Sequence, residues 1–106
     1  MELTVYWTQF AEDKLEDVFL YYSEKASLRV ARNLIDEIIK ASLELSKNPF
    51  VGQKELLLTG RVQEFRYLVC KNYKLIYWVN QEKRRLEIVN VFDCRQNPAK
   101  IGKLID

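Results

Sequence analysis

The first residues of the chain alternate between polar and apolar side chains. The apolar positions are Leu3, Val5 and Trp7. A period of two is typical of a strand with one buried face. Thr8, which follows, belongs to a residue type that caps helices, because its hydroxyl accepts a hydrogen bond from a backbone N–H of the first turn. The pattern therefore predicts a short strand that leads directly into a helix.

Apolar residues then recur every three or four positions in two consecutive stretches. In the first stretch they are Phe10, Ala11, Leu15, Val18, Phe19 and Tyr22. In the second they are Ala31, Leu34, Ile35, Ile38, Ile39 and Ser42, extended by Leu43 and Leu45. Both spacings predict amphipathic helices. We expect Ser27 to cap the second helix and Asn48-Pro49 to end it, since the residue before proline avoids helical dihedral angles. So short a break between helices predicts an antiparallel hairpin.

After a loop that includes Gly52, Lys54 and Thr59-Gly60, the period returns to two. The three stretches rich in Val, Ile, Tyr, Phe and Trp are Val62–Cys70, Tyr73–Asn80 and Arg85–Phe92. They predict three strands. We expect a tight turn at Lys71-Asn72, with the positive φ at Asn72.

Asn97 and Pro98 predict the cap and first position of a short C-terminal helix that reaches Leu104 and is weakened by Gly102. The order β-αα-βββ predicts an α+β fold in which a helical hairpin packs on one face of a small, mainly antiparallel sheet. A length of 106 residues fits one domain over residues 1–106.

Composition narrows the class of protein. A hydrophobic share of 48% and a charged share of 30% are ordinary for a globular domain. Charged residues interrupt every apolar run before it reaches the roughly 20 residues of a membrane span. The first residues lack the basic segment of a signal peptide, so we expect a cytoplasmic protein. Cys70 and Cys94 are too few for a disulfide scaffold and are expected to be buried, reduced thiols.

The chain contains no histidine, which excludes Ser-His-Asp triads, Cys-His pairs and histidine-bearing zinc sites. We therefore expect no metal ion and no cofactor. Charge is uneven: residues 1–60 carry 7 Lys or Arg and 10 Asp or Glu (net −3), and residues 61–106 carry 10 and 5 (net +5), which together give +2. A basic second half suggests an anionic partner on one face; the alternative is that both halves are simply solvated.

Four segments, taken in this order, resemble the RelE/ParE superfamily of toxins. Trp7–Leu15 is similar to the family's first strand running into a helix. Asn48–Gly52 resembles the proline-and-glycine segment after its second helix. Phe65–Leu68 followed by Asn72–Tyr77 resembles a strand pair with an arginine and paired tyrosines. Val89–Pro98 is similar to the last strand and its arginine-bearing exit. The resemblance spans nearly the whole chain.

The resemblance implies the toxin of a bacterial type II toxin–antitoxin system, of the kind associated with plasmid stabilization. A growth-inhibiting toxin of this kind is neutralised by a cognate antitoxin whose C-terminal segment wraps the toxin. RelE-like members cleave mRNA on the ribosome, whereas ParE-like members poison DNA gyrase without cutting anything themselves. The expected assemblies are a homodimer or a toxin–antitoxin hetero-oligomer, because a small domain with exposed strand edges and an uncovered apolar groove needs a partner.

Arg66 and Arg95 match arginines of the family, and a guanidinium suits a phosphate. They are the catalytic candidates if the chain is RelE-like. Lys54, Lys71 and Lys74 are candidate contacts to a target or phosphate. For Arg66 the alternative is a structural role, fastening the sheet to the loop after the second helix through a carboxylate.

Tyr73 is a further candidate contact. Aromatic residues on neighbouring strands can stack on bases, but about half of them must lie under the helices. Tyr67, Tyr73 and Tyr77 share the parity of core positions, and Tyr73 and Tyr77 are expected in or at the edge of the core.

RelE-like nucleases usually carry a tyrosine or histidine just after the last strand. Here Asn97-Pro98-Ala99 occupies that stretch. Arginine is a poor general base because it stays protonated at neutral pH, which leaves a lysine or Glu55 as the remaining candidates. This departure favours ParE-like action on DNA gyrase. The alternatives are a RelE-like ribosome-dependent endoribonuclease and an inactive toxin fold that serves as a partner-binding module.

Overall fold

The computed structural model describes residues 2–105, with side chains described up to residue 102. The elements in chain order are β1 (Thr4–Trp7), α1 (Gln9–Lys25), α2 (Leu28–Lys47), β2 (Gln53–Lys54), the 3-10 turn η1 (Leu56–Leu58), β3 (Arg66–Cys70), β4 (Tyr73–Asn80), β5 (Arg85–Asp93) and α3 (Lys100–Ile105). The predicted α+β class, the helical hairpin and the short C-terminal helix are confirmed.

Both helices of the hairpin begin where the sequence predicts. The side-chain oxygen of Thr8 accepts a hydrogen bond from the backbone nitrogen of Ala11 at 3.1 Å, and that of Ser27 accepts one from Val30 at 3.1 Å. Each bond satisfies one of the backbone donors that the first helical turn leaves unpaired. The second helix ends at Lys47 with Asn48 as its C-cap, as the following proline requires.

The sheet has five strands in the order β1-β5-β4-β3-β2. Only β1 pairs in parallel, with β5, so the sheet is mainly antiparallel as predicted. Strand β2 was not predicted, because Gln53 and Lys54 form a strand only by pairing with Tyr67 and Arg66. The predicted start of the next strand at Val62 is wrong. That side chain is 101% exposed, and the strand begins at Arg66, where pairing with β4 starts.

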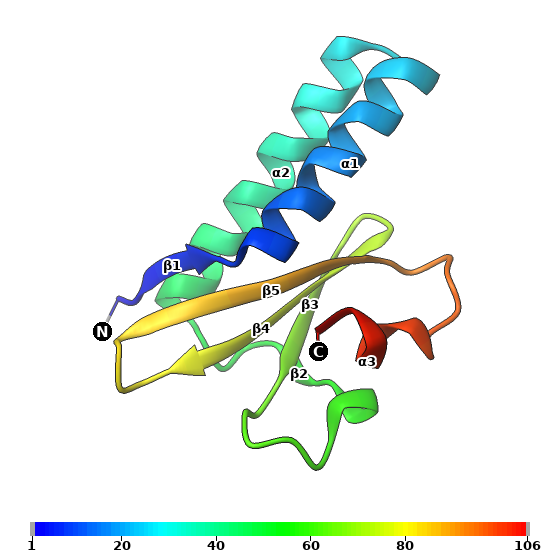
Figure 1. Cartoon of the computed structure of the whole chain (residues 1–106). Coiled ribbons are helices and arrows are strands. Elements are labelled where there is room, and N and C mark those ends of the chain that lie inside the picture. The colour runs from blue at the N-terminus through cyan, green and yellow to red at the C-terminus, as the bar shows by residue number, and fades with distance from the viewer. Residues whose placement is uncertain (1, 106) are drawn as a thin grey trace.

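The sheet is covered on both faces, and Figure 1 shows the tilted hairpin of α1 and α2 on one side and α3 with η1 on the other. On the hairpin face, Tyr77 packs with Ala11 and Leu45, and Leu75 packs with Val18 and Ile38. On the opposite face a second cluster contains Leu58, Phe65, Ile76, Val89, Phe92 and Ile101. The prediction named only the first of these layers. The second explains why a nearly continuous apolar run, rather than strict alternation, marks β5.

Two expectations about burial on the hairpin side need correction. Ile39 and Leu43 were placed on the buried stripe of α2, but they are 39% and 52% exposed. Tyr67 does not share a face with Tyr73 and Tyr77. It pairs with Ile76 in β4 and packs against the second cluster, since odd numbering in one strand does not carry over to the next.

The turns and the cysteines also differ from expectation. Lys71, not Asn72, takes the positive φ, at 56°. Helix α3 begins at Lys100 and not at Pro98. It follows a turn in which the Asn97 side chain accepts a hydrogen bond from the backbone nitrogen of Ala99. Cys70 is half-buried and Cys94 is exposed, and both are free thiols, so the expectation of buried thiols is wrong. No helix within residues 2–105 has the length and apolar character needed to cross a membrane.

Candidate functional site

An open cleft of about 340 Å³ lies at the end of β5, where the chain leaves the sheet beside α1. Its charged lining residues are Lys14 and Asp17 from α1, Asp93 at the end of β5, and Arg95 just beyond it. Two cations therefore face two carboxylates. Tyr73, from the start of β4, forms part of the same wall.

Arg95 is bound to Asp93 by three hydrogen bonds. Its Nε lies 2.9 Å from Asp93 Oδ1, its Nη2 lies 2.8 Å from Oδ2, and its backbone nitrogen lies 2.9 Å from Oδ1. Such two-pronged pairing is the strong form of a charge-assisted hydrogen bond. These bonds from Arg95 hold the pKa of Asp93 below its usual value, and Asp93 in turn raises the pKa of Arg95. Both groups therefore stay charged at neutral pH.

Tyr73 is only 4% exposed. Burial first, and then the neighbouring Tyr22, raise the pKa of its phenol above the ordinary value. Burial has this effect because it disfavours the charged phenolate. The phenol therefore stays protonated at neutral pH and is able to donate a hydrogen bond, but it does not act as a base.

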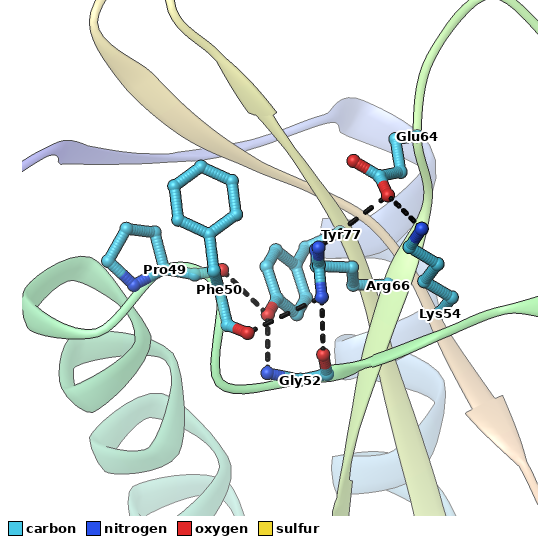
Figure 2. Close-up of polar contacts among 7 residues, drawn as sticks. All are labelled: Pro49, Phe50, Gly52, Lys54, Glu64, Arg66 and Tyr77. Carbon is cyan, nitrogen blue, oxygen red and sulfur yellow. Dashed lines mark hydrogen bonds and ion pairs between the residues drawn. The ribbon is translucent and has the colours of Figure 1, made fainter.

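Arg66 lies in a different network, at the loop that follows α2 (Figure 2). Its Nη1 donates to the backbone oxygen of Gly52 at 2.9 Å and to that of Phe50 at 3.3 Å, and its guanidinium lies 5.3 Å from the centre of the Phe50 ring. Its Nη2 lies 3.5 Å from Glu64. The side chain is 17% exposed. Arg66 thus fastens the sheet to the loop after the second helix, mainly through carbonyl groups rather than the carboxylate expected from sequence.

Tyr77 completes that network from the neighbouring strand (Figure 2). Its hydroxyl donates to the carbonyl of Pro49 at 2.8 Å and accepts from the backbone N–H of Gly52 at 3.0 Å. Burial raises the pKa of this phenol, although the Gly52 N–H and Arg66 act in the opposite direction. No sequence pattern pointed to this contact, because the partners are 25 and 28 residues apart.

The three candidate lysines are spread over the molecule. Lys54 pairs with Glu64 at 3.1 Å and lowers the pKa of that carboxyl. Lys71 lies in the β3–β4 turn, 3.5 Å from Glu37 on α2. The third, Lys74, has its own partner on the face opposite the hairpin.

Lys74 lies 3.1 Å from the buried carboxylate of Glu55 and 4.2 Å from the centre of the Tyr67 ring. Glu55, the candidate base, also accepts a hydrogen bond from the backbone of Leu57 and so caps η1. Both described contacts of its side chain are therefore structural.

The structure brings Arg95 and Tyr73 together in one cleft but keeps Arg66 apart from them. In the sheet, Arg66 on β3 pairs with Tyr77 on β4, and Asp93 on β5 pairs with Tyr73 on β4. Tyr73 and Tyr77 are four residues apart along β4. Because a strand rises about 3.3 Å per residue, these positions are roughly 13 Å apart. The sequence analysis did not identify Asp93 as a site residue. An aspartate two positions before an arginine at the end of a strand is nevertheless a pattern from which the Asp93–Arg95 pair could be predicted. Contact of these residues with a target stays a prediction.

The family described as ParE toxin of type II toxin-antitoxin system, parDE, matches residues 5–98 of the chain. Among solved structures, the chain is similar to one titled as the chromosomal ParDE toxin–antitoxin system from P. aeruginosa. That match has a TM-score of 0.73 and 16% identity, and covers 87% of this chain and 96% of the other. A comparison with curated proteins finds no match.

Two further structures share the fold. The toxin-antitoxin complex RelBE2 from Mycobacterium tuberculosis matches with a TM-score of 0.59 and 20% identity, over 88% of this chain and 99% of that one. A mutant of the E. coli toxin RelE in the free state matches with a TM-score of 0.65 and 15% identity, over 99% and 95%. At these identities the likeness concerns the fold, and both branches of the superfamily have it.

Proposed function

Because this chain belongs to the ParE toxin family of type II toxin–antitoxin systems, we propose that it inhibits growth by acting on DNA gyrase and that a cognate antitoxin neutralises it. The rival function, ribosome-dependent cleavage of mRNA, needs a base for the 2′-hydroxyl, an acid for the leaving oxygen and cations on the phosphate. The arrangement around Arg95 supports the first of these functions.

The observation that carries the proposal is the pairing of Arg95 with Asp93. The guanidinium that a nuclease would place on the scissile phosphate is already bound to both oxygens of a carboxylate. The cleft around it carries two cations and two carboxylates, so its charge is balanced. A balanced cleft attracts an RNA backbone poorly, because phosphate affinity depends on excess positive charge.

The groups near Arg95 are also poorly suited to act as the general acid and general base of RNA cleavage. Tyr73 is buried, with a raised pKa, and Asp93 is held by Arg95. Arg66 is engaged by loop carbonyls at another part of the sheet. These contacts support a toxin that binds its target without cutting it. In that mechanism Arg95 is a residue of the binding surface, and its exposed side chain, at 52%, is accessible to a protein target.

The deciding experiment is a pulse-label measurement after the chain is induced alone in a bacterial host. We expect DNA synthesis to fall first while protein synthesis persists. Purified chain should then inhibit supercoiling by purified gyrase, and Arg95→Ala should weaken that inhibition while the protein stays folded. Arg32→Ala is the matched control, since Arg32 is an exposed arginine on α2 that does not line the cleft.

A collapse of translation within minutes, with replication continuing, would reject gyrase and support the endoribonuclease. Harmless expression at high level would instead support an inactive fold that binds a partner. Arg95→Ala separates the first two functions further. In a nuclease it should abolish mRNA cleavage outright, whereas at a protein interface truncation of an arginine that anchors the contact costs about 2 kcal/mol or more of binding energy.

A further inference from the structure

A second cleft, of about 410 Å³, lies where β1, the end of α2 and the β4–β5 turn meet. Its apolar walls are Leu3, Pro49, Phe50 and Val79. Its charged lining residues are Lys47, in the last turn of α2, and Arg84, in the β4–β5 turn. No acidic side chain is among the described residues that line it. The cleft is separate from the Arg95 cleft, with which it shares no lining residue.

Backbone hydrogen bonds fix two of its walls. The N–H of Leu3 donates to the carbonyl of Ser46 on α2 at 3.2 Å, and the N–H of Thr4 donates to the carbonyl of Arg84 at 3.4 Å. The N-terminal segment is therefore tied to both the helix and the turn. A site whose walls are already held in place loses little conformational entropy when a ligand binds.

The third wall is held by the network drawn in Figure 2. Tyr77 binds the carbonyl of Pro49, and Arg66 binds the carbonyl of Phe50 and lies over its ring. Phe50 is nevertheless 52% exposed. Four polar contacts from two strand residues thus fix a loop whose aromatic side chain faces outward. Rigid, exposed aromatic residues are the usual anchors of protein interfaces.

We propose that this cleft binds an acidic segment of a protein partner. The segment inserts one apolar side chain between Leu3, Phe50 and Val79 and places carboxylates beside Lys47 and Arg84. Charge complementarity points to this occupant, since the described residues of the lining include two cations and no acid. Two cations flanking four apolar side chains fit a side chain with a neighbouring carboxylate better than they fit nucleic acid, which needs a track of several cations. The proposal does not depend on gyrase being the target.

The test is an NMR titration of the ¹⁵N-labelled full chain with a synthetic peptide of ten residues. The peptide is rich in Glu and Asp, has one central leucine, and is capped at both ends. We expect saturable binding, with the largest amide shifts at Leu3, Phe50, Val79 and Arg84. A peptide with serine in place of the leucine, and one with lysines in place of the acids, should each bind at least about tenfold more weakly.

Three variants locate the site on the protein. We expect about a tenfold or greater loss of affinity for the peptide in each of three variants, Phe50→Ala, Lys47→Glu and Arg84→Glu, because each removes a contact residue of a small site. Lys40→Glu is the matched charge control, because it lies two turns earlier on α2 and does not line the cleft. The Lys40→Glu variant should bind the peptide as tightly as the wild type does. Circular dichroism of each variant checks that the fold is retained.

The proposal is overturned if no saturable binding occurs, if the amide shifts lie outside the cleft, or if the serine peptide binds equally well. Competition by a ten-nucleotide oligothymidylate at these same amides would overturn it as well, and would assign the cleft to nucleic acid. Because the titration contains no gyrase, its failure leaves the proposed function standing, and failure of the pulse-label experiment leaves the titration result standing.

Discussion

The phenol oxygen of Tyr77 lies 3.0 Å from the backbone nitrogen of Gly52, so close that position 52 has no room for a side chain. A Cβ at this position would lie 2.4 Å from the Tyr77 oxygen and 2.8 Å from the carbonyl oxygen of Tyr67. The second atom belongs to the backbone and cannot move without disturbing β3. The glycine is therefore required by a close approach.

We predict that Gly52→Ala lowers the free energy of unfolding by about 1–3 kcal/mol, the usual cost of overpacking. Urea denaturation measures this. Gly102→Ala is the matched control, because its Cβ would lie at an ordinary 3.6 Å from Arg61, and alanine favours a helix by up to about 1 kcal/mol over glycine. Equal stability of the Gly52 variant and the wild type would contradict the close approach.

Asp93 makes stability depend on pH. Hydrogen bonds from Arg95 hold its pKa below the ordinary value in the folded chain. A carboxyl of this kind stabilises the fold above its unfolded pKa, about 3.9, and this contribution is lost as the pH falls through the folded pKa. Asp93→Asn should therefore be less stable than wild type by about 1 kcal/mol at pH 7, and the difference should shrink as the pH falls below about 4 and through the folded pKa of Asp93.

Urea midpoints at several pH values measure this difference. Glu87 is the control group, since it also titrates in the acid range. Burial alone would raise the pKa of Glu87, but hydrogen bonds from Asn80 and Arg85 together lower it. The acid-induced loss due to Glu87 should persist in Asp93→Asn and disappear in Glu87→Gln. A constant difference between Asp93→Asn and wild type at all pH values would refute the role given to Asp93.

The helical hairpin could be predicted because its signals are local. Thr8 and Ser27 cap the helices through contacts three residues away, and Pro49 ends the second helix by a steric effect on its neighbour. Strand β4 was also predicted with its observed bounds, since both turns beside it are polar.

The remaining parts depend on register and on distant contacts. β2 exists because Gln53 pairs with Tyr67, and the face of Tyr67 is fixed by its pairing with Ile76. Neither the β2–β3 pairing nor the face of Tyr67 can be predicted from the local sequence pattern. For the site, the Asp93–Arg95 pair was not predicted, although the two residues are only two positions apart. The bond from Arg66 to the carbonyl of Phe50 joins residues 16 apart, and no sequence pattern predicts it.

The buried pair of Glu55 and Lys74 is predicted to stabilise the face opposite the hairpin. The Glu55 side chain is 3% exposed and lies 3.1 Å from the ammonium of Lys74, which is 22% exposed. Lys74→Met would leave a buried carboxylate without its cation, at a cost of about 3 kcal/mol, and adding Glu55→Gln should recover much of it. Lys71→Met, which breaks an exposed pair, should cost less than about 1 kcal/mol. Additive effects in the double-mutant cycle would contradict direct pairing.

Asn90 should weaken the fold rather than support it. It is fully buried beside the second cluster, and within the described part of the chain neither polar atom of its amide has a hydrogen-bond partner. An unpaired buried amide costs about 1–3 kcal/mol, so Asn90→Val should raise the free energy of unfolding by about 1 kcal/mol after the loss of some packing. Asn80→Val is the matched control: it removes an amide that donates to Glu87 at 2.9 Å and should lower stability. Denaturation of both variants tests this, and a destabilised Asn90→Val would mean that the amide is satisfied in the folded protein.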